Sequence, residues 1–74
     1  MRELVIANGF VMVHSCGCDG LTETYRNESY PGVKIKLKIK KGKFQIFEND
    51  RIVKDGVQQN FNPIFTAYLN EKKG

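Results

Sequence analysis

The residues best suited to chemistry lie in one short segment, where His14, Cys16, Cys18 and Asp19 fall within six positions. Their types and the Cys-x-Cys spacing raise the question of a zinc site. Residues two apart on an extended strand lie about 7 Å apart, and two thiolates sharing one zinc ion must come closer, so Gly17 would have to bend the chain sharply. Because no other cysteine or histidine completes such a site, we predict no metal and no cofactor, and we expect two partly buried thiols.

Catalysis by these cysteines would also lack the residues that it needs. A cysteine nucleophile requires a base and an orienting group, and His14 is the only histidine, two positions from Cys16. A disulfide between Cys16 and Cys18 would close a very small, strained ring, which disfavours it. The eight acidic residues are scattered singly, so the sequence shows no carboxylate pair for acid–base chemistry. We therefore predict no catalytic residue and no enzyme; a small metal- or thiol-dependent protein centred on His14, Cys16 and Cys18 is kept as an alternative.

A row of lysines is the most suggestive binding feature. From Val33 to Lys40 apolar residues and lysines alternate without interruption, which predicts a β-strand with one buried face and one lysine face. On a regular strand these lysines, with those across the next turn, form a positive stripe about 20 Å long, enough to follow several phosphates. The candidate binding residues of the stripe are Lys34, Lys36, Lys38, Lys40, Lys41 and Lys43.

Two interpretations of this stripe stay open. Sheet surfaces that bind nucleic acid usually add aromatic rings for base stacking, and Phe47 is the only aromatic residue expected beside the lysines. Lysines on the outer face of an edge strand also protect against edge-to-edge aggregation. The stripe is therefore either a nucleic-acid site or a solvated face that can form the rim of a protein contact.

A second candidate surface lies in the connection from Ser15 to Gly32, which is rich in glycine and polar residues. Long irregular connections in small domains are often functional. Tyr25, Arg26 and Tyr30 in this connection are residue types favoured at protein interfaces. Tyrosines equally anchor a loop to its own core, so both roles are considered.

The N-terminal segment predicts an opening β-hairpin, with strands over 4–7 and 10–13 joined by Asn8-Gly9. Both runs are apolar at nearly every position, which indicates strands covered on both faces or a buried interface. An export signal is the alternative for this segment, since Arg2 precedes the apolar run and Cys16 follows it. The Asn8-Gly9 turn and His14 fit such a signal poorly, so we expect a cytoplasmic protein.

The rest of the chain predicts a meander followed by a helix. Turn signals at Asn49-Asp50 and Asp55-Gly56 separate short β-prone runs. Besides the lysine strand, strands are predicted over 21–25, 44–47, 51–54 and 57–59. Asn62-Pro63 is a typical helix start, and the residues that follow it form a one-sided apolar stripe, namely Ile64, Phe65, Tyr68 and Leu69. We predict an α+β fold: a small antiparallel meander or barrel-like sheet of five or six strands with one short C-terminal helix.

Size and composition narrow the expected function. A chain of 74 residues supports one core, so residues 1–74 are taken as a single β-rich domain. Its 41% hydrophobic and 27% charged residues are typical of a folded protein, and no stretch is long enough to cross a bilayer. The net charge of +4 favours acidic partners. Residue usage, rich in lysine and asparagine and poor in alanine, indicates an AT-rich genome such as that of a bacterium or a phage.

These observations favour a small non-catalytic protein-interaction or assembly module, whose partner is another protein or a second copy of the chain. A small domain has little stability to offset the strain of an elaborate active site. The first alternative is a nucleic-acid-binding module that uses the lysine strand, and the second is the metal- or thiol-dependent protein. A membrane partner is not expected.

Overall fold

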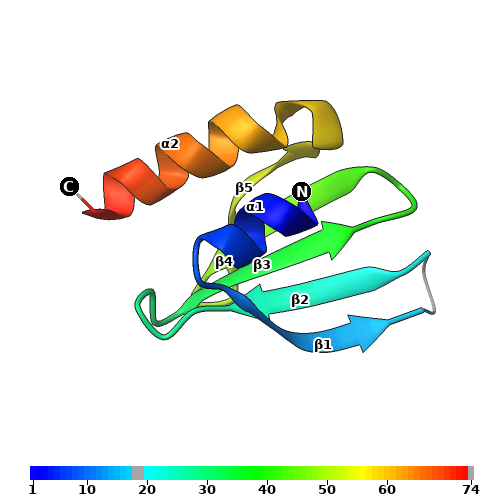
Figure 1. Cartoon of the computed structure of the whole chain (residues 1–74), viewed down its shortest axis with the longest axis horizontal. Helices are drawn as coiled ribbons and strands as arrows, with labels where there is room; N and C mark the ends of the chain where they lie inside the picture. The colour runs from blue at the N-terminus through cyan, green and yellow to red at the C-terminus, as the bar shows by residue number, and fades with distance from the viewer. Residues whose placement is uncertain (18–19, 74) are drawn as a thin grey trace.

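The computed structural model describes residues 1–17 and 20–73 and contains one open antiparallel sheet of five strands (Figure 1). Each strand pairs with the next strand along the chain, which gives the order β1-β2-β3-β4-β5. This arrangement confirms the predicted α+β fold with a meander sheet, and the sheet does not close into a barrel. The strands are β1 (Val11–Cys16), β2 (Thr22–Arg26), β3 (Val33–Lys38), β4 (Lys43–Glu48) and β5 (Arg51–Val57).

The helices lie over one face of the sheet (Figure 1). They are α1 (Arg2–Ala7), the short 3-10 helix η1 (Gln58–Asn60) and α2 (Phe61–Lys73). Because strand side chains alternate between the two faces, alternate residues of the central strands β2, β3 and β4 enter the core beneath these helices. The fully or nearly fully buried apolar residues are Val5, Phe10, Tyr25, Val33, Ile35, Leu37, Phe44, Ile46, Phe61, Phe65, Tyr68 and Leu69.

Strand β3 has the alternation that the sequence predicts. Val33, Ile35 and Leu37 are buried, and the lysines between them point to the opposite face. The strand ends at Lys38, two residues earlier than predicted, because Ile39 begins the turn that Gly42 completes with a φ of +64°.

The predicted opening hairpin is wrong, because residues 2–7 form helix α1. Val5 enters the core while Ile6 remains exposed, so the segment buries one side of a helix. Asn8 donates from its side-chain amide to the Leu4 carbonyl at 2.8 Å, and Gly9 takes a φ of +88°. Asn8-Gly9 thus ends a helix here instead of joining two strands. A helix end, like a hairpin turn, uses a glycine in the left-handed conformation.

The predicted turn at Asp55-Gly56 is also wrong, because β5 continues through it to Val57. Gly56 pairs with Phe44 on β4, and a Cβ at this position would lie 3.2 Å from the Phe44 ring. The glycine therefore makes room for an aromatic ring. The strand predicted over 57–59 is replaced by η1, which leads the chain from the sheet into α2.

The C-terminal helix is confirmed, with its apolar stripe facing the sheet. Phe65, Tyr68 and Leu69 are buried and Ile64 is partly buried against the same core. The helix begins at Phe61, one residue before the predicted start. Phe61 is fully buried and packs edge-on against Phe44 at a centroid distance of 5.0 Å.

Candidate binding surfaces

The face of the sheet opposite the helices is a surface made of side chains from all five strands. Residues paired across neighbouring strands share a face, so the strand pairing assigns each side chain to the core or to this surface, which we call the open face. No helix of the described chain covers it (Figure 1). The open face consists of Val11, His14, Cys16, Thr22, Thr24, Arg26, Lys34, Lys36, Lys38, Lys43, Gln45, Phe47, Ile52, Asp55 and Val57.

The lysines of β3 lie at the centre of the open face. Strand β3 is third of five and is hydrogen-bonded to β2 on one side and β4 on the other. The interpretation of this lysine row as protection of an edge strand is therefore wrong, because β3 has no free edge to protect. A row of cations on a central strand needs another explanation.

Phe47 lies between two of these lysines. Lys34 Nζ and Lys36 Nζ each lie 5.3 Å from the centroid of the Phe47 ring, a distance typical of cation–π contact. Lys34 also forms an ion pair with Asp50 in the β4–β5 turn, with Nζ and Oδ1 3.5 Å apart. The Asp50 side chain is 92% exposed, so this pair is largely screened by water. The open face thus holds an aromatic ring beside two cations.

The other predicted basic residues divide between this surface and the neighbouring turn. Arg26 lies opposite Lys34 and Lys43 lies opposite Lys38, so both belong to the open face. Lys40 and Lys41 lie in the β3–β4 turn, beyond the end of the row. The predicted stripe is therefore a patch that extends across β2, β3 and β4, with two further lysines at one end.

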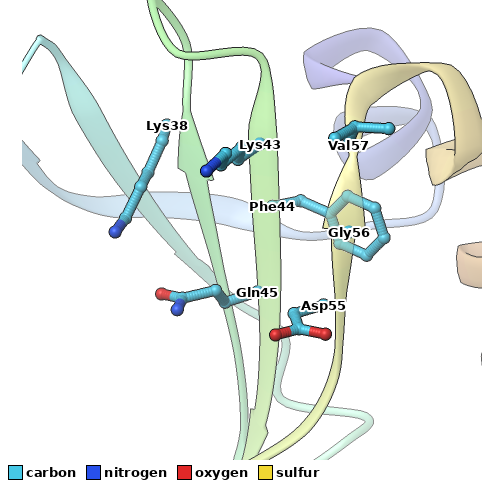
Figure 2. Close-up of a pocket in the computed structure, with 7 residues that line it drawn as sticks. All are labelled: Lys38, Lys43, Phe44, Gln45, Asp55, Gly56 and Val57. Atoms are coloured by element: carbon cyan, nitrogen blue, oxygen red, sulfur yellow. The ribbon is translucent and has the colours of Figure 1, made fainter.

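A shallow hollow of about 370 Å³ opens on this patch between β4 and β5. Figure 2 shows that Lys38 and Lys43 lie near one end of it, with Gln45 and Asp55 farther along the strands. The backbone at Gly56 forms part of the wall, and the Phe44 ring crosses behind this strand on the core side (Figure 2). The lining combines charged and amide groups with the apolar side chains of Phe44 and Val57, so the hollow has mixed character.

The two tyrosines of the second candidate surface have structural contacts. Tyr25 is 1% exposed, and its hydroxyl donates to Glu23 Oε1 at 2.9 Å. The Tyr30 ring stacks on the Phe10 ring with centroids 5.8 Å apart. Both tyrosines therefore anchor their segment to the core, and of the predicted group only Arg26 lies on the open face.

The Glu23 carboxylate is a buried ionic contact that sequence reasoning missed. Arg2 donates to it from Nε at 3.0 Å and from Nη2 at 2.6 Å, in addition to the bond from Tyr25. The hydrogen bonds from Arg2 lower the pKa of Glu23 despite its burial. Because all of these donors stabilise the charged form, Glu23 is poorly suited to acid–base catalysis, and its role is to hold α1 on β2.

A second carboxylate holds α2 on β4. Glu48 accepts a hydrogen bond from the Tyr68 hydroxyl and pairs with Lys72 Nζ at 2.7 Å. The bond from Lys72, followed by that from Tyr68, lowers the pKa of Glu48, while burial and the neighbouring carboxylate raise the pKa of Tyr68. These partners are 20 or more positions apart in the chain, so only the α2 stripe and the strand alternation could have hinted that they meet.

A third feature is apolar and lies at the β1 edge of the sheet. Ile6, Val11, Met12 and Val13 are each at least half exposed, and we call these four residues the apolar edge. Next to them lies a hollow of about 440 Å³, which the Ile6 and Met12 side chains line together with Phe10. The sequence pattern had indicated an interface in this segment, although with a hairpin in place of a helix and a strand.

The segment with the candidate metal ligands is only partly described. Cys18 and Asp19 lie outside the described residues, and with them the predictions about a metal site and a disulfide. His14 is exposed on β1, and Cys16 pairs in register with Thr22 and is partly buried. Within residues 1–17 and 20–73 no three metal-binding side chains come together.

Comparison with protein families, curated proteins and solved structures finds no match to this chain. In the described part of the chain, no helix has the length and apolar character needed to span a bilayer.

Proposed function

We propose that this chain is a non-catalytic interaction module that self-associates along the apolar edge. The observation that carries the proposal is strand β1, a sheet edge whose residues Val11–Cys16 include no lysine, arginine, aspartate or glutamate. Both buried or half-buried carboxylates that could have served in catalysis, Glu23 and Glu48, are occupied by helix-anchoring contacts.

The other edge of the same sheet has the protection that β1 lacks. Strand β5 carries Arg51, Lys54 and Asp55 on its exposed positions. Charged side chains on an edge strand discourage the addition of a further strand, whereas an apolar, uncharged edge with free backbone groups favours it. The contrast between the two edges supports β1 as the docking edge.

The charge distribution favours a second copy of the chain as the partner. Each copy carries a net charge of +4, so two copies repel one another at most orientations. The positive side chains of the sheet lie mainly on the open face, and β1 itself adds none. Antiparallel pairing of β1 with its own copy in a register centred on Met12 would place Val11 opposite Val13 and Met12 opposite Met12, without placing like charges opposite one another.

Sedimentation velocity over a wide concentration range tests this proposal. We expect the weight-average mass of the wild-type protein to rise toward that of a dimer, and Val13→Lys to keep the protein monomeric by placing a charge on the edge. Val53→Lys is the matched control, since Val53 is also the extra residue at an irregularity of an edge strand and is 40% exposed against 53% for Val13. It should associate like the wild type. A wild-type protein that stays monomeric throughout, or equal loss in both variants, would contradict the proposal.

A further inference from the structure

We propose that the open face binds single-stranded nucleic acid, with phosphates along the lysines of β3 and a base stacked on Phe47. This inference goes beyond self-association, because it uses side chains of strands β2, β3 and β4 in place of the β1 edge and does not depend on a dimer. Charge, spacing and the position of one aromatic ring support it.

The charge of the open face has one dominant sign. Among the described residues it carries five cationic side chains and one carboxylate, Asp55, and the exposed Asp50 of the β4–β5 turn pairs with Lys34. Glu23 and Glu48 do not neutralise this face, since they lie on the core side with the helices. The cationic residues are Arg26, Lys34, Lys36, Lys38 and Lys43. A patch with this excess of positive charge attracts a polyanion and makes its binding sensitive to salt.

The lysine row suits an extended chain of phosphates. Alternate residues of a strand lie about 6.6 Å apart, so the row from Lys34 to Lys38 extends about 13 Å in a straight line. Hydrogen bonding on both sides holds β3 in place, which means that the cations are largely arranged before a ligand arrives. A flexible single strand can follow this row, with Lys43 and Arg26 flanking it on the neighbouring strands.

Phe47 distinguishes this surface from a purely electrostatic one. Its ring lies on the open face, where Lys34 and Lys36 lie 5.3 Å from its centroid. When phosphates draw these ammonium groups toward themselves, the ring face becomes available to a base, and stacking on an aromatic side chain tolerates every base. Gln45 lies beside Lys36 and supplies a neutral hydrogen-bonding group.

The geometry favours a single strand over a duplex. A protein reads duplex DNA by inserting a helix or a two-stranded ribbon into a groove, and the open face consists of regular strands with no helix on it (Figure 1). In a duplex the bases are already stacked on one another, so Phe47 could not contribute. An acidic protein would satisfy the lysines but would make no use of the half-buried Phe47 ring.

Fluorescence anisotropy with a labelled mixed-sequence oligonucleotide, single-stranded and as a duplex, tests the inference over a range of salt concentrations. We expect the single strand to bind more tightly than the duplex, with log K falling against log salt at about −0.7 for each phosphate contact. Unlabelled poly-glutamate should displace the labelled oligonucleotide less well than the unlabelled single strand does. The two competitors are compared at the same number of charges.

Two variants separate the contribution of the phosphate contacts to binding from that of base stacking. Lys36→Glu with Lys38→Glu should weaken binding by at least about tenfold and flatten the salt dependence, because phosphate contacts are lost. Phe47→Leu should weaken binding about 5- to 150-fold through lost stacking, while the salt dependence remains unchanged. Lys54→Glu with Lys73→Glu is the matched control, since it reverses the same number of charges at exposed positions off the open face.

Several results would overturn the inference. They are no binding of the single strand at low salt, equal affinity for the duplex, equal competition by poly-glutamate, or the same loss in the control as in the Lys36 and Lys38 double variant. Circular dichroism of each variant shows whether the sheet is retained, and Phe47→Leu leaves the charges in place if the charge reversals unfold the protein. Val13→Lys should still bind the single strand, so failure of the dimer and failure of this site are distinguishable.

Discussion

Replacing Glu23 by glutamine should separate two contributions to the free energy of unfolding, that of the buried charge and that of the packing of the side chain. The substitution keeps the size of the side chain but removes the negative charge and exchanges one acceptor oxygen for a donor. In the wild-type protein Glu23 is 5% exposed and accepts two hydrogen bonds from Arg2 and one from Tyr25. The variant leaves donors of Arg2 facing another donor, so α1 loses its ionic contact with the sheet while Val5 stays packed in the core.

The expected loss follows from the nature of these bonds. Hydrogen bonds that involve a charged group contribute about 1.5–3 kcal/mol each, and more is lost when a buried partner is left unsatisfied. The Arg2 side chain is 48% exposed and can turn to water, which keeps the cost of Glu23→Gln near the range of one such bond, about 1.5–3 kcal/mol at pH 7. For a domain of this size each kcal/mol lowers Tm by about 4–8 °C.

The pH dependence identifies the charge as the cause. Hydrogen bonds from Arg2 lower the pKa of Glu23 in the folded protein, so its stabilisation is complete above the unfolded pKa of about 4.3 and is lost as the pH falls through the lower folded pKa. Glutamine does not titrate. The difference between wild type and Glu23→Gln should therefore be full at pH 7 and shrink below about pH 4.

Urea denaturation at several pH values between 7 and 3, followed by circular dichroism, measures this difference. Glu28→Gln is the control, because Glu28 is exposed in the β2–β3 connection, and its stability should match that of the wild type at every pH. A difference that stays constant from pH 7 to pH 3, or that is no larger than in the control, would refute the assignment of Glu23 as a charged anchor of α1.

The remaining predictions concern packing and use the same assay. Phe61→Ala should cost about 3–5 kcal/mol, because Phe61 is fully buried edge-on against Phe44; a loss below about 1 kcal/mol would contradict the packing of α2 on the sheet. Gly56→Ala should cost about 1–3 kcal/mol, because the added Cβ lies 3.2 Å from the Phe44 ring. Gly17→Ala is its control, since nothing lies within 4 Å of a Cβ there, and equal effects at the two glycines would contradict the close approach.

The elements that could be predicted from sequence are those with a long repeating pattern. Strand β3 repeats its alternation without interruption, and α2 has an apolar stripe from Phe61 to Leu69, about two and a half turns. Each repeat adds independent evidence for one backbone geometry. For the same reason the placement of the β3 lysines opposite the core could be predicted, whereas their position on a central strand could not, because strand order depends on pairing between distant segments.

The N-terminal helix was missed because its local pattern is ambiguous. Asn8-Gly9 provides a left-handed glycine, and both a hairpin turn and a helix end use that conformation. The choice depends on Val5, which must reach a core made by residues far along the chain, and on Arg2, whose partner Glu23 lies 21 positions away. Neither contact leaves a periodic signal in a segment of six residues.

The same alternation that divides the sheet into two faces also divides its charges. Glu23 and Glu48 are at core-facing positions, where a carboxylate is stable only with a partner, and Arg2 and Lys72 from the two helices provide those partners. These carboxylates are therefore not available to the lysines on the other side of the sheet. The contacts that hold the helices in place keep Glu23 and Glu48 away from the positive charge of the open face, so the stability of the fold and the attraction of a polyanion depend on separate groups of residues.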